Sequence, residues 1–165
     1  MTTQDFTAAL RIRHPSIDPD EITRRLGLPP LHCWRAGDPR TPPSGERTQS
    51  ARTETYWVAV LPASPINVFE TFAALYRTPL EAWPQSVRTA LQSPEFLMWV
   101  PLLNMRRDRK FWKQFGEEGG SVEMLINVEQ TEGFRLDLQP NLLAMLVDLR
   151  IGLSFSVEPA MEEAA

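Results

Sequence analysis

The sequence predicts one α+β domain, in which a mixed sheet of about five strands carries helices on one face. Alternating apolar and polar residues predict the strands, and capping side chains placed directly before prolines predict where helices begin. The two ends of the chain also resemble each other, because each runs from a strand through a proline-started helix to a glycine and another strand. This likeness favours two β-α-β units in one sheet, in a ferredoxin-like or split β-α-β arrangement. We assign residues 1–158 to the domain, 65–115 to a helical insertion between its halves, and 159–165 to a flexible tail.

The first helix is predicted from its two ends. Asp18 stands directly before Pro19, so its side chain can cap the helix while the proline loses no hydrogen bond. Glu21 occupies the third helical position, where it completes a capping box and meets the positive end of the helix dipole. Gly27 suits the left-handed conformation that ends many helices. The acidic look of this stretch is therefore explained by helix capping and not by catalysis.

The strands are predicted from alternation and composition. In the N-terminal half, residues 6–12 place apolar or small residues at every second position, and residues 55–61 are β-branched and aromatic. In the C-terminal half, residues 121–130 alternate cleanly, and a turn leads into a further strand at 134–138. A helix beginning near Pro140 then precedes a last alternating strand that ends at Val157.

The composition excludes several classes of protein. A net charge of −4 and a pI near 5.3 disfavour general affinity for nucleic acid or anionic membranes. The longest apolar run, residues 96–103, is too short to cross a bilayer, and the N-terminus lacks the pattern of a secretory signal. The single Cys33 cannot form an internal disulfide, and with two histidines it lacks the paired spacing of a zinc site. We therefore expect a cytoplasmic protein with no membrane segment, no metal and no cofactor.

A set of motif residues recurs in order along the N-terminal part: Leu10-x-Ile12, Asp18-Pro19-x-Glu21-Ile22-Thr23-x-x-Leu26-Gly27-Leu28-x-Pro30, Trp34-x-x-Gly37-Asp38 and Tyr56-Trp57. These residues resemble a bacterial domain-of-unknown-function family, number four-two-seven-nine in that series. The leucine-rich helix and Leu153-x-Phe155 near the C-terminus are similar to the end of the same family. The resemblance covers roughly residues 8–61 and 121–157, and it leaves about residues 77–120 uncovered. It implies a compact α+β fold without an established activity.

A thiol enzyme built on Cys33 and His14 is one alternative function. Catalysis would need a base within hydrogen-bond reach of the sulfur. His32 is poorly placed, because adjacent residues of an extended stretch point to opposite faces, and His14 would have to reach Cys33 across the sheet. Since small buried thiols are common in proteins, we favour structural roles for these residues.

The basic segment at residues 106–113 is the remaining candidate for function. Its five basic residues and one acid give it a charge of +4, while the rest of the chain carries −8. It could be a solvated helix face that packs Phe111, Trp112 and Phe115 inward, a nucleic-acid site, or a docking site for an acidic protein. The net negative charge of the whole chain disfavours nucleic acid.

We predict a non-catalytic protein-recognition domain, an immunity-type or regulatory protein that acts by binding a protein partner. Tryptophan and arginine dominate the energetics of interfaces, and charge accelerates encounter. The candidate partner-binding residues are Trp99, Arg106, Arg107, Arg109, Lys110 and Trp112. The alternatives are a small thiol-dependent enzyme using Cys33 and His14, and a nucleic-acid-binding protein using residues 106–113.

Overall fold

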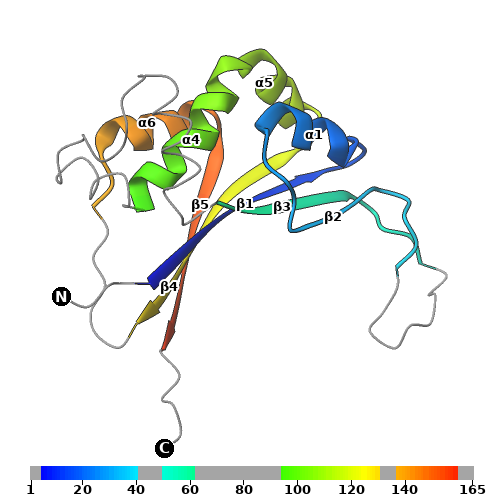
Figure 1. Cartoon of the computed structure of the whole chain (residues 1–165). Helices are drawn as coiled ribbons and strands as arrows, with labels where there is room; N and C mark the ends of the chain where they lie inside the picture. Colours follow the sequence, from blue (N-terminus) through cyan, green and yellow to red (C-terminus); the bar gives the residue numbers. More distant parts are fainter. Residues whose placement is uncertain (1–4, 41–49, 62–93, 131–136, 160–165) are drawn as a thin grey trace, which may run out of the picture.

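A computed structural model describes residues 5–40, 50–61, 94–130 and 137–159, shown in Figure 1. The described elements, in chain order, are β1 (Asp5–His14), α1 (Pro19–Leu26), β2 (His32–Trp34), β3 (Thr55–Leu61), α4 (Pro94–Arg107), α5 (Arg109–Glu117), β4 (Ser121–Gln130), α6 (Pro140–Asp148) and β5 (Ile151–Pro159).

The described strands form one mixed sheet in the order β2-β3-β1-β4-β5. Neighbours are antiparallel from β2 through β4, and β5 joins β4 in parallel at the edge. The unit β1-α1-β2 leaves a gap between its strands, and β3 fills that gap, which is the split β-α-β arrangement. The predicted α+β class, with its mixed five-stranded sheet, is confirmed.

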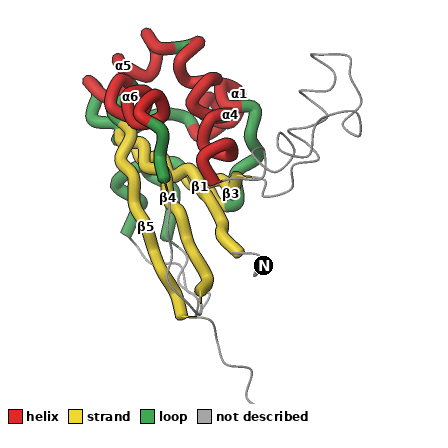
Figure 2. Tube along the Cα trace, turned by 90° about the vertical axis from the view of Figure 1, so that its left-hand side faces the viewer, coloured by secondary structure: helices red, strands yellow, loops and turns green. Residues whose placement is uncertain are grey.

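The described helices all lie on one face of the sheet (Figures 1 and 2). The strands turn every second side chain toward these helices, and this layer is the hydrophobic core. Its fully buried members include Leu10, Ile12, Trp57, Leu102, Met105, Met124, Ile126 and Leu142. In Figure 2 the C-terminal ends of β4 and β5 extend past the helices. Phe155 and Val157 are about half exposed there, although they pair in register with buried residues of β4.

The second β-α-β unit consists of β4, α6 and β5. The strand predicted at 134–138 is wrong for its two described residues. Asp137 and Leu138 lie in a loop before α6, and residues 134–136 fall outside the described part of the chain. β4 itself pairs with β5 along its length, from Val122 opposite Ile151 to Gln130 opposite Pro159. No further strand is needed to complete the unit.

The predicted helical insertion, residues 65–115, contains α4 and most of α5. Its part up to residue 93 lies outside the described residues. The two helices occupy the place of the second helix in a β-α-β-β-α-β chain order, between β3 and β4. β5 reaches Pro159, one residue into the predicted tail, and residues 160–165 are not described.

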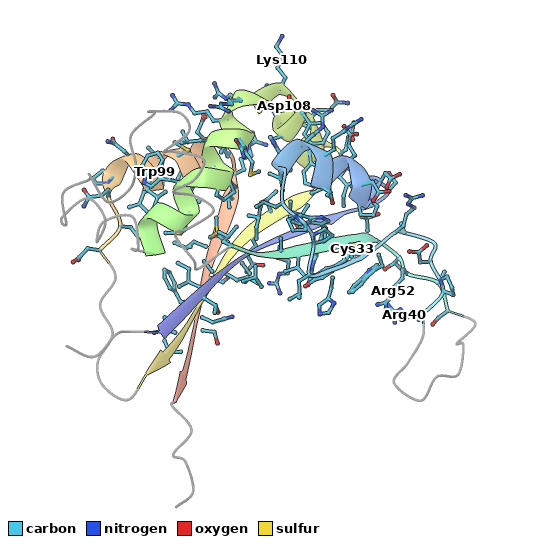
Figure 3. The ribbon with its side chains drawn as sticks, in the orientation of Figure 1. Cys33, Arg40, Arg52, Trp99, Asp108 and Lys110 are labelled. Atoms are coloured by element: carbon cyan, nitrogen blue, oxygen red, sulfur yellow. The ribbon has the colours of Figure 1, made fainter. Side chains whose placement is uncertain are left out.

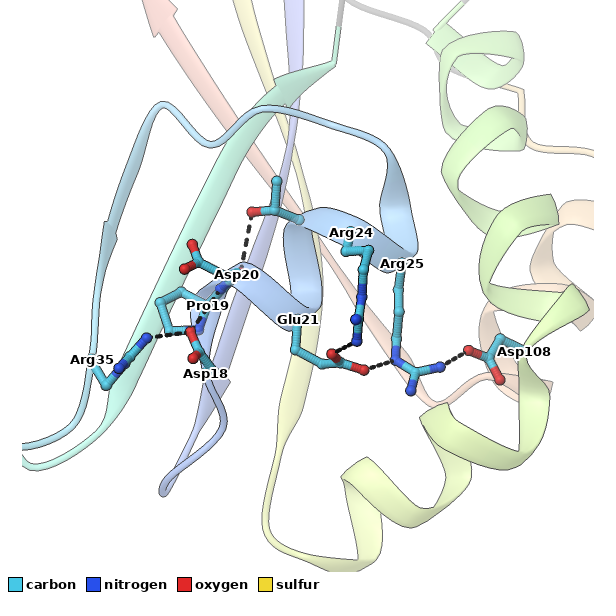
Figure 4. A network of polar contacts seen from close by, with 9 residues as sticks. Asp18, Pro19, Asp20, Glu21, Arg24, Arg25, Arg35 and Asp108 are labelled. Atoms are coloured by element: carbon cyan, nitrogen blue, oxygen red, sulfur yellow. Dashed lines mark hydrogen bonds and ion pairs between the residues drawn. The ribbon is translucent and has the colours of Figure 1, made fainter.

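The ends of α1 follow the predicted capping pattern (Figure 4). The Asp20 amide donates to Asp18 Oδ1 at 3.0 Å, and Gly27 closes the helix at φ 67°. Glu21 does not show the capping-box contact, because its carboxylate pairs with Arg24 and Arg25 one turn later. Arg25 also pairs with the carboxylate of Asp108, which ties α1 to the start of α5.

We expect Asp18→Ala to lower the urea midpoint of unfolding while leaving partner binding unchanged. The substitution removes the acceptor for the Asp20 amide and the ion pair with Arg35 at 2.5 Å. Asp18→Asn is the matched control, since it keeps a capping oxygen and loses only the charge. Denaturation followed by circular dichroism should rank wild type and Asp18→Asn above Asp18→Ala. Equal midpoints for Asp18→Ala and wild type would refute the capping role.

Candidate functional site

Five basic side chains, from Arg106, Arg107, Arg109, Lys110 and Lys113, form an exposed surface at the junction of α4 and α5. We call this surface the basic face. Arg106 and Arg107 stand in the last turn of α4, and the other three are exposed because α5 is amphipathic and turns its aromatic residues toward the core. In Figure 3 Lys110 projects outward from the helical layer, away from the sheet.

The basic face is only partly neutralised by neighbouring carboxylates. Arg109 Nη2 lies 2.5 Å from Asp148 Oδ1, and Lys113 Nζ lies 3.8 Å from Glu117 Oε1. Within the described residues Arg106, Arg107 and Lys110 have no ion-pair partner. Exposed cations without a partner remain available for an external anion.

The two tryptophans predicted as anchors lie deeper than the basic side chains. Trp112 is only 4% exposed and packs against Phe111 and Phe115, with ring centroids 5.0 and 5.3 Å away. The inward packing of α5 is therefore confirmed, and Trp112 cannot act as an exposed anchor. Trp99 is half-buried against the core on α4. Of the predicted partner-binding set, the four basic residues are the ones at the surface.

A pocket of about 700 Å³ shares Arg109, Lys110 and Lys113 with the basic face and lies between α5, the start of β4 and the turn from α6 to β5. Its basic lining comes from Arg109, Lys110, Lys113 and Arg150, and its one carboxylate is Asp148. Its remaining lining residues are Trp112, Phe115, Gly116, Gly120, Val122 and Leu149. Sequence reasoning missed Asp148 and Arg150, because they lie far along the chain from α5 and only the folded chain brings them together.

We expect Gly120→Ala to destabilise the protein by about 1–3 kcal/mol, the usual cost of overpacking. A Cβ at this position would overlap the ring of Phe115, which is buried and packs against His14 with centroids 4.7 Å apart. Gly116→Ala is the matched control, since a Cβ there meets nothing within 4 Å and alanine favours a helix. Chemical denaturation should show a loss for the first variant and none for the second. Equal effects would show that the Phe115 contact does not matter.

The N-terminal unit ends in a loop that matches the motif Trp34-x-x-Gly37-Asp38. Asp38 Oδ2 accepts from the Arg35 amide at 2.7 Å, and Gly37 adopts a φ of 91° that favours glycine. The Gly37 amide donates to the Arg52 carbonyl at 2.8 Å, which aligns the loop with the approach to β3. Residues 4–71 match the family described as Domain of unknown function (DUF4279).

The DUF4279 match confirms the resemblance for the N-terminal motifs, over β1, α1, β2 and β3. The C-terminal helix and strand, which the sequence also likened to that family, lie beyond the matched residues. The basic face and the pocket lie beyond them too, so the family match carries no information about either. No curated protein and no solved structure matches the chain.

Within the DUF4279 segment, Cys33 and His14 are kept apart by the sheet. Cys33 is exposed on β2, so the expectation of a buried thiol is wrong, and His14 is buried at the end of β1, with β3 between the two strands. Strands two positions apart are roughly 10 Å from each other. His14 Nδ1 accepts from the amides of Ser16 and Ile17 at 3.1 and 2.9 Å, while Nε2 lies 3.5 Å from Glu118 Oε2. Neither ring nitrogen is directed to the thiol.

His14 is expected to make stability depend on pH. Burial lowers the pKa of His14 below its ordinary value, and the nearby Glu118 carboxylate opposes this only in part. The unfolded chain therefore binds a proton more readily than the folded chain, so stability should fall as pH drops below about 6.5 and level off below the folded pKa. His14→Asn keeps an acceptor for the two amides but does not titrate. Urea unfolding between pH 7.5 and 5 should show a smaller pH dependence in this variant; equal slopes would refute the assignment.

The other face of the sheet carries an aromatic ladder of four side chains from Arg52, Trp34, Tyr56 and Arg13. The two rings stack with centroids 4.3 Å apart, Arg52 lies 4.0 Å from the centroid of Trp34, and Arg13 lies 5.9 Å from that of Tyr56. A base can stack only on a free ring face. In this ladder each ring has a stacked ring on one side and a guanidinium on the other, so the ladder fastens β2 to the sheet and presents no platform for bases.

Neither a metal-binding cluster nor a membrane-spanning helix is found among the described residues. They contain no group of three or more His, Cys, Asp or Glu side chains that could hold a metal ion. Among the same residues, no helix has the length and apolar character needed to cross a membrane.

Proposed function

We propose that this chain is a non-catalytic recognition domain that binds an acidic protein partner through the basic face. One observation carries the proposal: three exposed cations, Arg106, Arg107 and Lys110, have no ion-pair partner in the described part of the chain, and they lie together on adjoining helices. Opposite charge on a partner would accelerate encounter and align the two surfaces.

A protein partner is favoured over nucleic acid for two reasons. The chain as a whole carries −4, which would repel a phosphate backbone outside the basic face. The aromatic ladder also offers no open ring face to bases. A compact acidic partner touches only the basic face, so it avoids the remaining negative charge.

The biological role that fits such binding is that of a cytoplasmic, immunity-type or regulatory protein, which acts by occupying its partner. The single Cys33 gives no indication of an oxidising compartment, since it has no second cysteine with which to pair. The separation of Cys33 from His14 weighs against the thiol-enzyme alternative.

The test compares two variants that change the net charge equally at different places. Arg106→Gln/Arg107→Gln removes two cations from the basic face, and Arg13→Gln/Arg24→Gln removes two elsewhere. We expect wild type and the second variant to retain the same acidic protein from a lysate of the native host, and the first variant to lose it. Equal retention by both variants would refute the proposal. Salt-sensitive binding of wild type to a single-stranded oligonucleotide in a mobility shift would favour the nucleic-acid alternative.

A further inference from the structure

We infer that the pocket beside α5 is a carboxylate site, which receives neighbouring acidic side chains of the partner. This inference rests on the proposed function and adds to it a defined place of contact. It concerns the pocket lined by Arg109, Lys110, Lys113 and Arg150, and not the outer residues Arg106 and Arg107.

Two distant parts of the chain supply the basic lining. Three of the cations come from the first two turns of α5, and Arg150 comes from the turn between α6 and β5. Four basic side chains and one carboxylate give the pocket lining a net charge of +3. Within the described residues Lys110 and Arg150 have no ion-pair partner. The positive charge of the pocket lining can therefore balance more than one additional carboxylate.

The carboxylate of Asp148 shows how a carboxylate binds at the pocket wall. Asp148 Oδ1 lies 2.5 Å from Arg109 Nη2 at the pocket wall. A guanidinium has five N–H donors, so this pair holds the Arg109 head in place and leaves donors for a second carboxylate. The contact is an arginine–carboxylate pair within the chain, and an arriving acidic side chain would repeat its chemistry.

The position of Arg150 follows from the way α6 ends. Arg150 has a φ of 56°, and it is the one residue other than glycine with a positive φ among those described. Glycine or asparagine would adopt this conformation at lower cost. Arg150 is exposed, so packing does not explain why arginine stands there. Arg150 directly follows Leu149, the C-cap of α6, where helices commonly end in this left-handed conformation, so the turn that ends the helix also brings the Arg150 cation to the pocket.

The apolar residues that line the pocket strengthen the attraction between its cations and an anionic ligand. Phe115, Val122 and Leu149 are each less than one-tenth exposed, so little water reaches the pocket from below. Charges beside such an apolar surface interact more strongly than charges in open water. A ligand that combines carboxylates with an apolar group suits both the walls and the floor.

Fluorine NMR of the whole chain labelled with 5-fluorotryptophan can test the site, because Trp112 lines the pocket. The chain has five tryptophans, and Trp112→Phe identifies the resonance of interest. The probe is the capped peptide Glu-Glu-Phe-Glu, with Gln-Gln-Phe-Gln as its uncharged control and inorganic phosphate as the free-anion probe. We expect the acidic peptide to shift the Trp112 resonance saturably, and neither of the other two to do so at the same concentration.

Two variants separate this inference from the proposed function. Lys110→Gln/Arg150→Asn removes the unpaired pocket cations, and asparagine tolerates the positive φ, so the fold should be retained. We expect it to weaken the acidic peptide about ten-fold, the effect of losing charge-assisted hydrogen bonds. Arg106→Gln/Arg107→Gln should change peptide affinity less than two-fold while still losing the protein partner.

An unmoved Trp112 resonance, or equal affinity in the pocket variant, would overturn the pocket assignment and leave the proposed function to the outer arginines. Phosphate binding as tight as that of the peptide would also overturn it, in favour of a free-anion site. Peptide binding together with unchanged partner capture by Arg106→Gln/Arg107→Gln would keep the pocket and refute the role of the outer arginines.

Discussion

Replacing Trp57 by alanine is expected to cost about 3–5 kcal/mol of stability, the usual range for a buried tryptophan. Trp57 is fully buried at the centre of β3, where the helices cover the sheet. Its Nε1 donates to Thr23 Oγ1 at 3.0 Å, and Thr23 Oγ1 donates in turn to the Pro19 carbonyl at 3.1 Å. The substitution therefore leaves a cavity under α1 and removes the hydrogen bond that joins that helix to β3.

Urea denaturation of three variants would measure this contribution. Trp57→Phe retains most of the apolar volume and should lose mainly the hydrogen bond, about 1 kcal/mol. Trp34→Ala is a second comparison, because Trp34 is half-buried in the aromatic ladder outside the core and should cost less than Trp57→Ala. A loss under about 1 kcal/mol for Trp57→Ala would mean that the core does not depend on this side chain.

Reversing the three unpaired cations of the basic face should slow association with the acidic partner by about ten-fold or more at low salt. Arg106→Glu/Arg107→Glu/Lys110→Glu replaces attraction by repulsion at the approach, before any short-range contact forms. The free energy of unfolding should change little, since exposed charges contribute less than about 1 kcal/mol each. Stopped-flow association and urea unfolding of the same variant would measure the two effects separately.

The triple reversal should act more on the association rate than on the dissociation rate, because long-range charge governs encounter. An unchanged association rate in a stably folded variant would show that the basic face is only a solvated helix surface. That simpler interpretation was open from the sequence, and the inward packing of Trp112 and Phe115 is compatible with it.

The sequence predicted those parts of the fold that local patterns determine. Alternation located β1 and β4, and the Asp18 cap and Gly27 located both ends of α1. β2 escaped prediction because three residues are too few to show a period. The strand expected at 134–138 rested on an alternating pattern, but its described residues, Asp137 and Leu138, lie in the loop before α6, and residues 134–136 lie outside the described part of the chain.

Only the part of the candidate site that lies on α5 could be predicted from the sequence. The basic residues of α5 stand out in the sequence because they lie close together and alternate with aromatic residues in an amphipathic pattern. Trp112, one of the expected partner-binding residues, lies beside Phe115 in the core, because both residues fall on the inward face of α5. Asp148 and Arg150 join the pocket through the path of α6 across the sheet, and no local pattern encodes that convergence.

The salt dependence of association with the captured partner decides whether the basic face recognises an acidic protein. Screening shortens the reach of charge from about 30 Å at 0.01 M salt to about 8 Å at 0.15 M. For wild type we expect the association rate to fall steeply across this range while the dissociation rate changes little, and the triple reversal should remove that slope. An association rate of the wild type that does not change with salt would rule out electrostatic recognition by this surface.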